Sequence, residues 1–255
     1  MPVNNINIKE NPAVKYRILN HWDNLDRSVE RGYAGLSIWK WDEINGDKGT
    51  MSLALKERLT TYCRANASIG INGSVINNVN ASPKMLNTLY IKKVKVLADM
   101  FRDYGIKVYL SVNFASPMAE GGLKTADPLN EGVRTWWKNK VNEIYKEIPD
   151  FGGFLVKANS EGQPGPGDYH RTHAEGANML AEALAPHGGL VIWRSFVYGN
   201  HEGEDRVMQA VTEFKDLDGK FNSNVILQTK NGPLDFQPRE PYAPLFDQIK
   251  HTPMM

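Results

Sequence analysis

The chain has 255 residues, of which 41% are hydrophobic and 23% charged, a composition that suits one large α/β domain or two small ones. Its 30 basic residues nearly balance its 29 acidic residues, so the net charge of +1 gives no electrostatic argument for a nucleic acid or a membrane surface as a partner. The single cysteine, Cys63, excludes an intrachain disulfide and a cysteine-based metal cluster, and we expect it in the core.

Residues 1–12 are polar and predict a loose lead-in, whereas residues 13–255 predict one partial domain. No apolar stretch reaches the length of a membrane span, and no signal-peptide core follows the first residues. The sequence leaves the localisation open, with the cytoplasm favoured for the chain as given.

Six β-rich runs recur along the chain, each followed by a polar or Gly/Pro-rich loop. The runs lie at 14–22, 73–80, 107–115, 152–159, 189–196 and 224–230. Several are continuously apolar rather than alternating, which is typical of parallel strands that are covered on both faces.

Helical patterns separate these runs. Residues 82–105 begin with Ser-Pro, repeat apolar residues at helical spacing and end at Gly105, which suits a C-cap. Residues 133–148 and 173–188 show the same kind of pattern. Strands that alternate with helices in this way predict repeated βα units.

The βα repeats predict a (β/α)8 TIM barrel, with about six of its eight units in this chain. A doubly wound sheet is the alternative, but no GxGxxG follows the first strand and no GxxxxGK[ST] occurs. The two remaining strands either lie within 23–72 or belong to a longer protein. That connection is rich in Trp, Asp and Gly, so we expect a site-forming loop there and a fragment of a longer chain.

The residues that follow the strands suit the recognition and cleavage of a sugar. Trp rings can cover the apolar face of a sugar, and Asn side chains can bond its rim of hydroxyls. Two separated carboxylates, Glu161 and Asp235, suit cleavage of a glycosidic bond, one as the acid and the other activating water or attacking directly. The strand-end residues are Asn20, His21, Trp22, Asp23, Asn24, Trp39, Lys40, Trp41, Asp42, Asn77, Asn78, Asn80, Asn113, Lys157, Asn159, Glu161, Trp193, Arg194, Lys230, Asn231 and Asp235.

Lys157, Arg194 and Lys230 add cationic groups to the same end of the predicted barrel. Three cations have little to bind in a neutral sugar, but a sugar carboxylate could be held by Arg in a bidentate manner and by Lys as a point charge. The composition and placement therefore favour an acidic sugar as the substrate, and they call for no cofactor.

Each of these residues also has a structural alternative. Trp136 and Trp137 lie inside a predicted helix and are assigned to the core. Glu161 could be a loop or capping residue, Asp235 could belong to a turn, and Arg194 could pair with Glu161. Their convergence at one end of the barrel favours the functional interpretation.

A metal site is a rival interpretation of the segment that contains Asp168, His170, His173 and Glu175. The two histidines are three residues apart and could share a helix face only if the helix covers both. The segment lacks the HExxH pattern, and His173 suits the start of a helix, so we expect no metal there.

Long stretches of the chain resemble the catalytic barrel of glycoside hydrolase family 67, the α-glucuronidases of xylan breakdown. They are RILNHWDNLDRSVERGYAGLSIWKWDE, INGSVINNVNA, YLSVNFASP, GGFLVKANSEGQPGPGDYHRTHAEGANMLA, VIWRSFVY and LQTKNGPLDFQPREP. The resemblance runs from about residue 10 to the last residue and is far more specific than any short motif.

The resemblance implies an inverting hydrolase that removes α-1,2-linked (4-O-methyl)glucuronic acid from the non-reducing terminal xylose of xylooligosaccharides. By matching position, Glu161 looks like the general acid, and Asp235 looks like one of two carboxylates that activate water. The groups around the uronic acid would be Lys157, Arg194 and Lys230, with Trp22 as a wall of the sugar pocket.

Family members also have a β-rich domain before the barrel and a helical domain after it, and neither matches here. The chain ends just before the strand expected to carry the second base carboxylate. We therefore expect weak or no activity from this chain alone, with self-association or a homodimer through open barrel edges.

Two alternatives to inverting catalysis remain open. A non-catalytic fragment could bind glucuronoxylan oligosaccharides through Trp22, Lys157 and Arg194. A retaining glycosidase would place Glu161 about 5 to 5.5 Å from its partner carboxylate. As the acid, Glu161 would need a raised pKa; burial would raise it and nearby cations would lower it, and the sequence leaves the balance open.

Overall fold

Six parallel strands form one sheet, and their order in the sheet is the order of the chain, β1-β4-β5-β6-β7-β8. The computed structural model describes residues 7, 9, 11–32, 35–195, 205, 208–231 and 242–255. The strands are β1 (Ile18–Asn20), β4 (Gly73–Val75), β5 (Lys107–Val112), β6 (Gly153–Val156), β7 (Leu190–Arg194) and β8 (Val225–Gln228). Every predicted strand is confirmed, each shorter than its apolar run.

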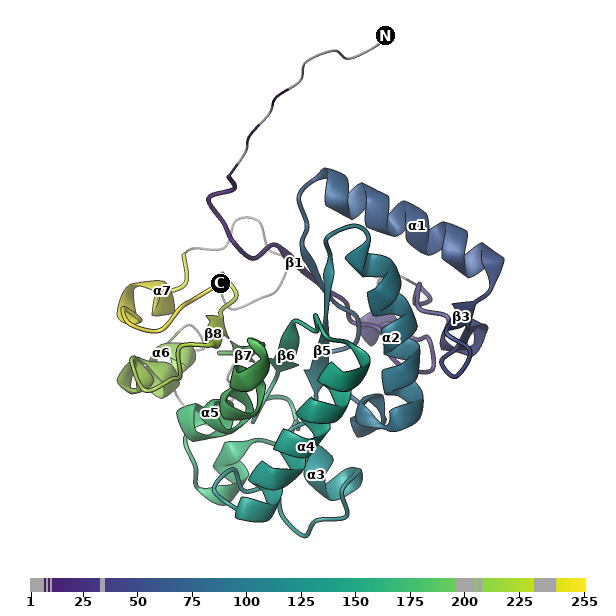
Figure 1. Ribbon diagram of the computed structural model, residues 1–255. Helices are drawn as coiled ribbons and strands as arrows, with labels where there is room; N and C mark the ends of the chain where they lie inside the picture. The colour runs from purple at the N-terminus through teal and green to yellow at the C-terminus, as the bar shows by residue number, and fades with distance from the viewer. Residues whose placement is uncertain are drawn as a thin grey trace.

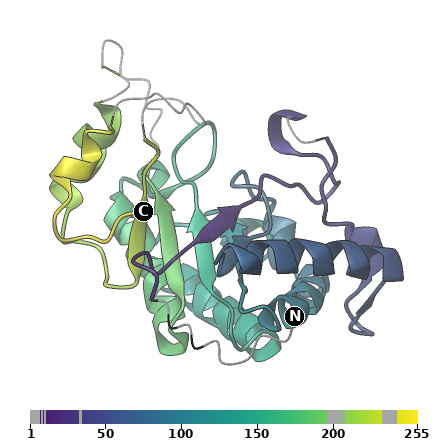
Figure 2. The same ribbon diagram turned by 90° about the horizontal axis from the view of Figure 1, so that it is seen from above.

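The helices lie in an arc outside the curled sheet, as Figures 1 and 2 show. They are α1 (Leu53–Ser68), α2 (Thr88–Arg102), α3 (Ser116–Ala119), α4 (Glu131–Glu147), α5 (His173–Leu184), α6 (Gln209–Phe214) and α7 (Leu245–Gln248). With the parallel sheet, this arrangement is six βα units of a (β/α)8 barrel, as predicted. None of the described helices has the length and apolarity to cross a membrane.

The core has two layers because the strands β4 to β7 are buried on both faces. Along β6, Phe154 and Val156 pack in the large cluster between the sheet and the helices. Leu155, between them in sequence, packs on the inner face of the sheet with Val75 and Ile192. This double burial explains why the strands are continuously apolar.

The described part of the connection between β1 and β4 adds no strand to the barrel sheet, as expected for 23–72, but it is not loop throughout. It contains the helix α1 and a hairpin of two short strands, β2 (Ile44–Asn45) and β3 (Thr50–Met51), and neither joins the barrel sheet. Ser52 caps α1 by accepting a hydrogen bond from the backbone N–H of Leu55. The fold therefore has no extra barrel strand among the described residues of this segment.

Several residues assigned to the core from sequence are confirmed there. Cys63 is fully buried on the inner face of α1, and Trp137 is fully buried on α4. Trp136 is partly buried and packs against the same core. These side chains stabilise the layer between helices and sheet.

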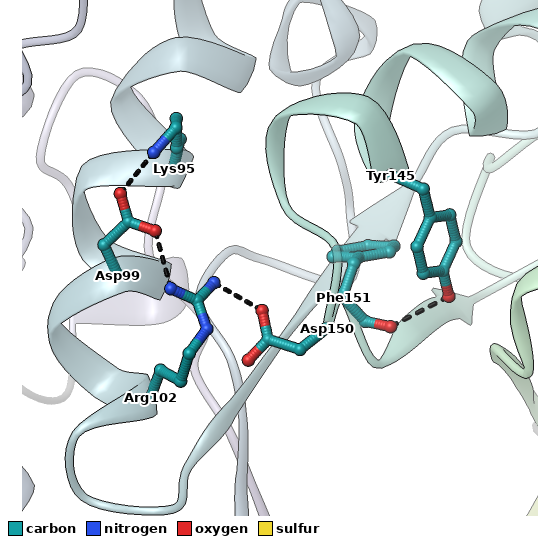
Figure 3. Close-up of polar contacts among 6 residues, drawn as sticks. All are labelled: Lys95, Asp99, Arg102, Tyr145, Asp150 and Phe151. Carbon is teal, nitrogen blue, oxygen red and sulfur yellow. Dashed lines mark hydrogen bonds and ion pairs between the residues drawn. The ribbon is translucent and has the colours of Figure 1, made fainter.

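Polar contacts connect the helices at the end of the barrel where the strands begin (Figure 3). On α2, Arg102 pairs with Asp99 at 2.8 Å and reaches Asp150, just before β6, at 2.5 Å. The Tyr145 hydroxyl on α4 donates to the Phe151 carbonyl at 2.8 Å. The ion pairs are partly exposed and contribute at most about 1 kcal/mol each, so their main effect is to fix where β6 enters the sheet.

The last residues of the chain run along β8 in the parallel direction. Met254 forms a bridge with Leu227, and Leu227 N–H donates to the Pro253 carbonyl at 2.8 Å. Thr229 N–H donates to the Met255 carbonyl at 2.9 Å. The sequence indicated no strand at this position. Residues 253–255 thus extend the sheet order by a seventh parallel segment.

Candidate active site

The candidate site lies at the carboxyl ends of the parallel strands, at one end of a cavity of about 610 Å³ that runs along β1 between it and β7–β8. Trp22, Arg194 and Lys230 all line it, although they come from three different parts of the chain. The inner face of the sheet contributes the apolar side chains of Val75 and Ile192 to the wall of this cavity. The structure therefore brings together three of the predicted substrate-binding residues around one space.

Lys157 directly follows β6 and is only 4% exposed. Its ammonium donates to the Asn80 amide oxygen at 2.9 Å and forms an ion pair with the Glu161 carboxylate. A buried cation is costly without such partners. The strand end thus holds a fixed positive charge beside a carboxylate.

Glu161 receives a second cation from a distant part of the chain. Arg31 Nη2 lies 3.3 Å from Glu161 Oε1, while Lys157 occupies Oε2. The Arg31 guanidinium also lies over the Trp22 ring, 5.7 Å from its centroid. A chain of contacts therefore runs from the cavity wall to the predicted acid.

The balance of burial and charge at Glu161 favours its ionised form. Burial raises the pKa of the Glu161 carboxyl, but the hydrogen bond from Lys157 and the charges of Lys157, Arg31 and Lys230 outweigh it. The net direction is a pKa below the ordinary value. This answers the question that the sequence left open, and it means that Glu161 carries no proton near neutral pH in the empty site.

Arg194 is 5% exposed at the end of β7. When the Asn20 amide is oriented to suit its neighbours, its oxygen accepts a hydrogen bond of 3.2 Å from Arg194 Nη1. This contact joins the carboxyl ends of β7 and β1 across the cavity. The sequence left open an ion pair between Arg194 and Glu161. The Glu161 carboxylate pairs instead with Lys157 and Arg31.

The model of the glycosyl hydrolase family 67 middle domain matches residues 1–255 of the chain. The chain belongs to glycosyl hydrolase family 67.

Curated relatives agree with this membership. The chain is 51% identical over 246 residues to the probable alpha-glucuronidase A of Aspergillus clavatus, covering 94% of this chain and 28% of that protein. It is 48% identical to alpha-glucuronidase A of Emericella nidulans, covering 98% of this chain and 30% of that one. For the alpha-glucuronidase of Hypocrea jecorina the identity is 48%, covering 95% and 29%. The chain thus spans less than a third of the length of these relatives.

Asp235, the base predicted from the family 67 resemblance, lies outside the described residues. The distance between Asp235 and Glu161 distinguishes inverting from retaining chemistry. Asp235 remains a prediction as one of the carboxylates that activate water.

Three tryptophans that the sequence placed among the strand-end residues do not reach the cavity. Trp39, Trp41 and Trp193 are at most 3% exposed and pack in the cluster between sheet and helices. Trp39 and Trp193 are oriented by ring contacts within that layer, the latter with His173 at 5.9 Å. Of the tryptophans after the strands, Trp22 is the one that lines the cavity.

Two residues of the alternative metal site, His173 and Glu175, have structural roles in the fold. His173 begins α5, as predicted, and its ring bonds Glu213 and Trp193, both at 3.2 Å. Glu175 caps the same helix through Thr172. Within the described part of the chain, no three His, Cys, Asp or Glu side chains are grouped so as to hold a metal ion.

Sequence reasoning missed Arg31. It lies in a short 3-10 turn, Glu30–Gly32, of the first loop, and its partner is 130 positions further along the chain. A loop arginine carries no periodicity or motif that reveals where it points, so only the folded geometry could identify it.

Proposed function

We propose that this chain forms part of the active site of an α-glucuronidase that releases (4-O-methyl)glucuronic acid, α-1,2-linked to the non-reducing terminal xylose of xylooligosaccharides, with inversion. The observation that carries the proposal is the buried Lys157 paired with Glu161 beside a cavity that Arg194 and Lys230 line. The names of the curated relatives, alpha-glucuronidases, support the same activity.

The cavity has the chemistry to recognise a uronic acid. Arg194 and Lys230 offer positive charge in a partly enclosed space, where a sugar carboxylate would be held more strongly than in water. Trp22 offers an aromatic surface for the apolar face of the sugar ring. An acidic sugar would add a carboxylate of opposite charge to this positive region, which is why it fits the cavity better than a neutral sugar.

Glu161 is the group we assign to protonate the leaving xylose oxygen. It lies at the rim of the site, with its side chain 39% exposed, where a bound oligosaccharide could reach it. In an inverting glycosidase a second carboxylate activates water on the opposite face of the sugar, about 6.5 to 9.5 Å away. Asp235 is our candidate for that role.

The test of this proposal is release of 4-O-methylglucuronic acid from an aldouronic oligosaccharide by the full protein and by Glu161→Gln. Loss of a general acid lowers kcat by about 10²- to 10⁴-fold. Because glutamine keeps the size of the side chain, binding of the oligosaccharide should survive. The matched control is Glu182→Gln, which removes an outer-surface pair with Arg134 and should leave turnover unchanged.

The outcomes separate the hypotheses. Binding of the oligosaccharide without turnover, in both wild type and Glu161→Gln, would favour the non-catalytic binding protein. Absence of both binding and turnover from the wild type would overturn the proposal.

A further inference from the structure

The Glu161 carboxylate is held at both oxygens, by two cations of different origin. Lys157 pairs with Oε2 and Arg31 Nη2 lies 3.3 Å from Oε1. An acid catalyst must carry its proton on one of these oxygens and present it to the leaving group. With both oxygens facing positive charges, the empty site holds Glu161 in its unprotonated form.

The two cations differ in how firmly they are placed. The Lys157 side chain is 3% exposed and is fixed further by Asn80, so it cannot leave its position easily. The Arg31 side chain is 48% exposed and comes from the loop after β1. It touches Glu161 on one side and the ring of Trp22 on the other. Arg31 is therefore the cation that can swing away without uncovering a buried charge.

Trp22 places this arginine at the wall of the cavity that the sugar would enter. The ring of Trp22 lines the cavity, and Arg31 lies 5.7 Å from the ring centroid. A sugar carboxylate in the cavity would bring a negative charge close to Trp22 and so to the Arg31 guanidinium that lies over its ring. When Arg31 turns toward the sugar, it withdraws its charge from Glu161.

We propose that Arg31 is a positioning residue that latches Glu161 in the empty site and releases it when a uronate occupies the cavity. The inference rests on the proposed function and adds a mechanism to it. On release Glu161 takes up one proton from the solvent and becomes the acid. A neutral sugar could not trigger the change, so the latch would couple acid formation to the presence of the uronic acid.

The charged groups that act on Glu161 come from three elements. They are Lys157 after β6, Arg31 in the loop after β1 and Lys230 after β8. All three lower the pKa of the Glu161 carboxyl in the empty site, against burial, which raises it. Removal of Arg31 alone should therefore raise that pKa while Lys157 and Lys230 continue to oppose protonation.

The experiment measures proton uptake when glucuronic acid binds to the full protein. Calorimetric titrations in two buffers of different ionisation enthalpy, from about pH 4 to about pH 7, give the number of protons taken up at each pH and bracket an ordinary carboxyl group. Wild type should take up protons, and Glu161→Gln should lose this uptake. Arg31→Gln should bind glucuronic acid with smaller uptake, its maximum moved to higher pH, because free Glu161 already holds more of the proton.

Two further variants make the comparison specific. Arg31→Lys keeps a positive charge in the loop and should restore most of the wild-type uptake. Arg134→Gln, an outer-surface arginine that pairs with Glu182, should behave as wild type.

Each other result overturns a different statement. Uptake in Arg31→Gln that matches wild type would overturn the latch. Loss of glucuronic acid binding in Arg31→Gln would make Arg31 part of the sugar site rather than a latch. Failure of the wild type to bind glucuronic acid would contradict the proposed function instead, and persistent uptake in Glu161→Gln would place the proton elsewhere.

Discussion

Asn159 and Glu161 both adopt left-handed backbone dihedrals, with φ of 50° and 49°, in the loop directly after β6. Asparagine tolerates this region, whereas a glutamate there costs of order 1 kcal/mol. Asp168 supports the loop by accepting hydrogen bonds from Asn159 Nδ2 at 2.9 Å and from Gly165 N–H at 3.0 Å. The hydrogen bonds of Asp168, at the far end of the same loop, therefore hold the strained backbone in place. In this conformation the Glu161 side chain points toward Lys157.

We expect Asp168→Asn to lower kcat about tenfold with little change in KM, because loss of charge-assisted bonds worth about 1.5 to 3 kcal/mol would let the loop relax. Release of methylglucuronic acid, normalised to the folded fraction by circular dichroism, measures the effect. Asp216→Asn, an exposed aspartate in the turn before β8, is the control. Unchanged kcat per folded molecule would mean that Glu161 is aimed by other contacts.

The sequence could predict Lys157 and Glu161 because a parallel strand delivers the residues after its carboxyl end to one edge of the sheet. It could not predict Arg31, whose position depends on how a long loop folds back over the barrel mouth. Nor could it predict the ionised state of Glu161, which depends on three cations from separate elements. Residues on strands are thus predictable from pattern, and their loop partners are not.

At the scale of the element, β6 depends on a glycine at its first position. Gly153 has φ of 134°, a conformation that side-chain-bearing residues rarely adopt, and a Cβ there would overlap the backbone of Leu190 on β7. The close approach lets β6 and β7 pair along their whole length. Lys157 directly follows β6, so the position of β6 that Gly153 allows also determines where Lys157 lies in the candidate site.

Gly153→Ala should therefore destabilise the fold by about 3 kcal/mol or more, from backbone strain together with displacement of β7. Chemical denaturation monitored by tryptophan fluorescence gives the change in the free energy of unfolding. Gly132→Ala, in the first turn of α4 where only the Asn130 side chain is near, should change it by no more than about 1 kcal/mol. Equal effects at the two positions would contradict the argument.

Element prediction failed at α1 for an identifiable reason. Its buried positions, Leu55, Leu59 and Cys63, form a single narrow stripe, and the remaining residues are polar or exposed. Ser52 provides a cap signal, but the Trp-rich and Gly-rich segment before it resembles a loop. In contrast, α2 and α4 bury broader faces against the sheet. The bounds of α4 were predicted to within two residues, whereas the predicted helix over 82–105 also took in the 3-10 turn Pro83–Leu86 that precedes α2.

At the scale of the whole molecule, Asp218 ties the last residues of the chain to the body of the barrel. Its carboxylate accepts backbone hydrogen bonds from Lys250 at 2.7 Å and from His251 and Thr252 at 3.0 and 2.9 Å. Burial raises the pKa of this carboxyl, but these bonds outweigh it and bring the pKa to about 2. Asp218 therefore fixes the turn at residues 250–252, from which residues 253–255 continue along β8.

The direction of this shift predicts how stability depends on pH. Because the folded protein favours ionised Asp218, the stabilisation is complete above the ordinary pKa of 3.8 and is lost as the pH falls from there through about 2. Asp218→Asn should lower the free energy of unfolding by about 1 to 2 kcal/mol near neutral pH. Urea denaturation at a series of pH values should show the difference from wild type shrinking below about pH 4; a difference independent of pH would refute it.

The agreement between sheet order and chain order has a consequence for biosynthesis. Each new strand of the main sheet pairs with the strand synthesised before it, because the parallel pairs from β1 through β8 follow one another in sequence. Each pairing closes the loop of a whole βα unit, as between Gly73 and Lys107, but it requires no strand beyond the next one. The sheet can therefore grow unit by unit as the chain is synthesised, and until the next strand arrives each exposed edge is also a place where misassembly can occur.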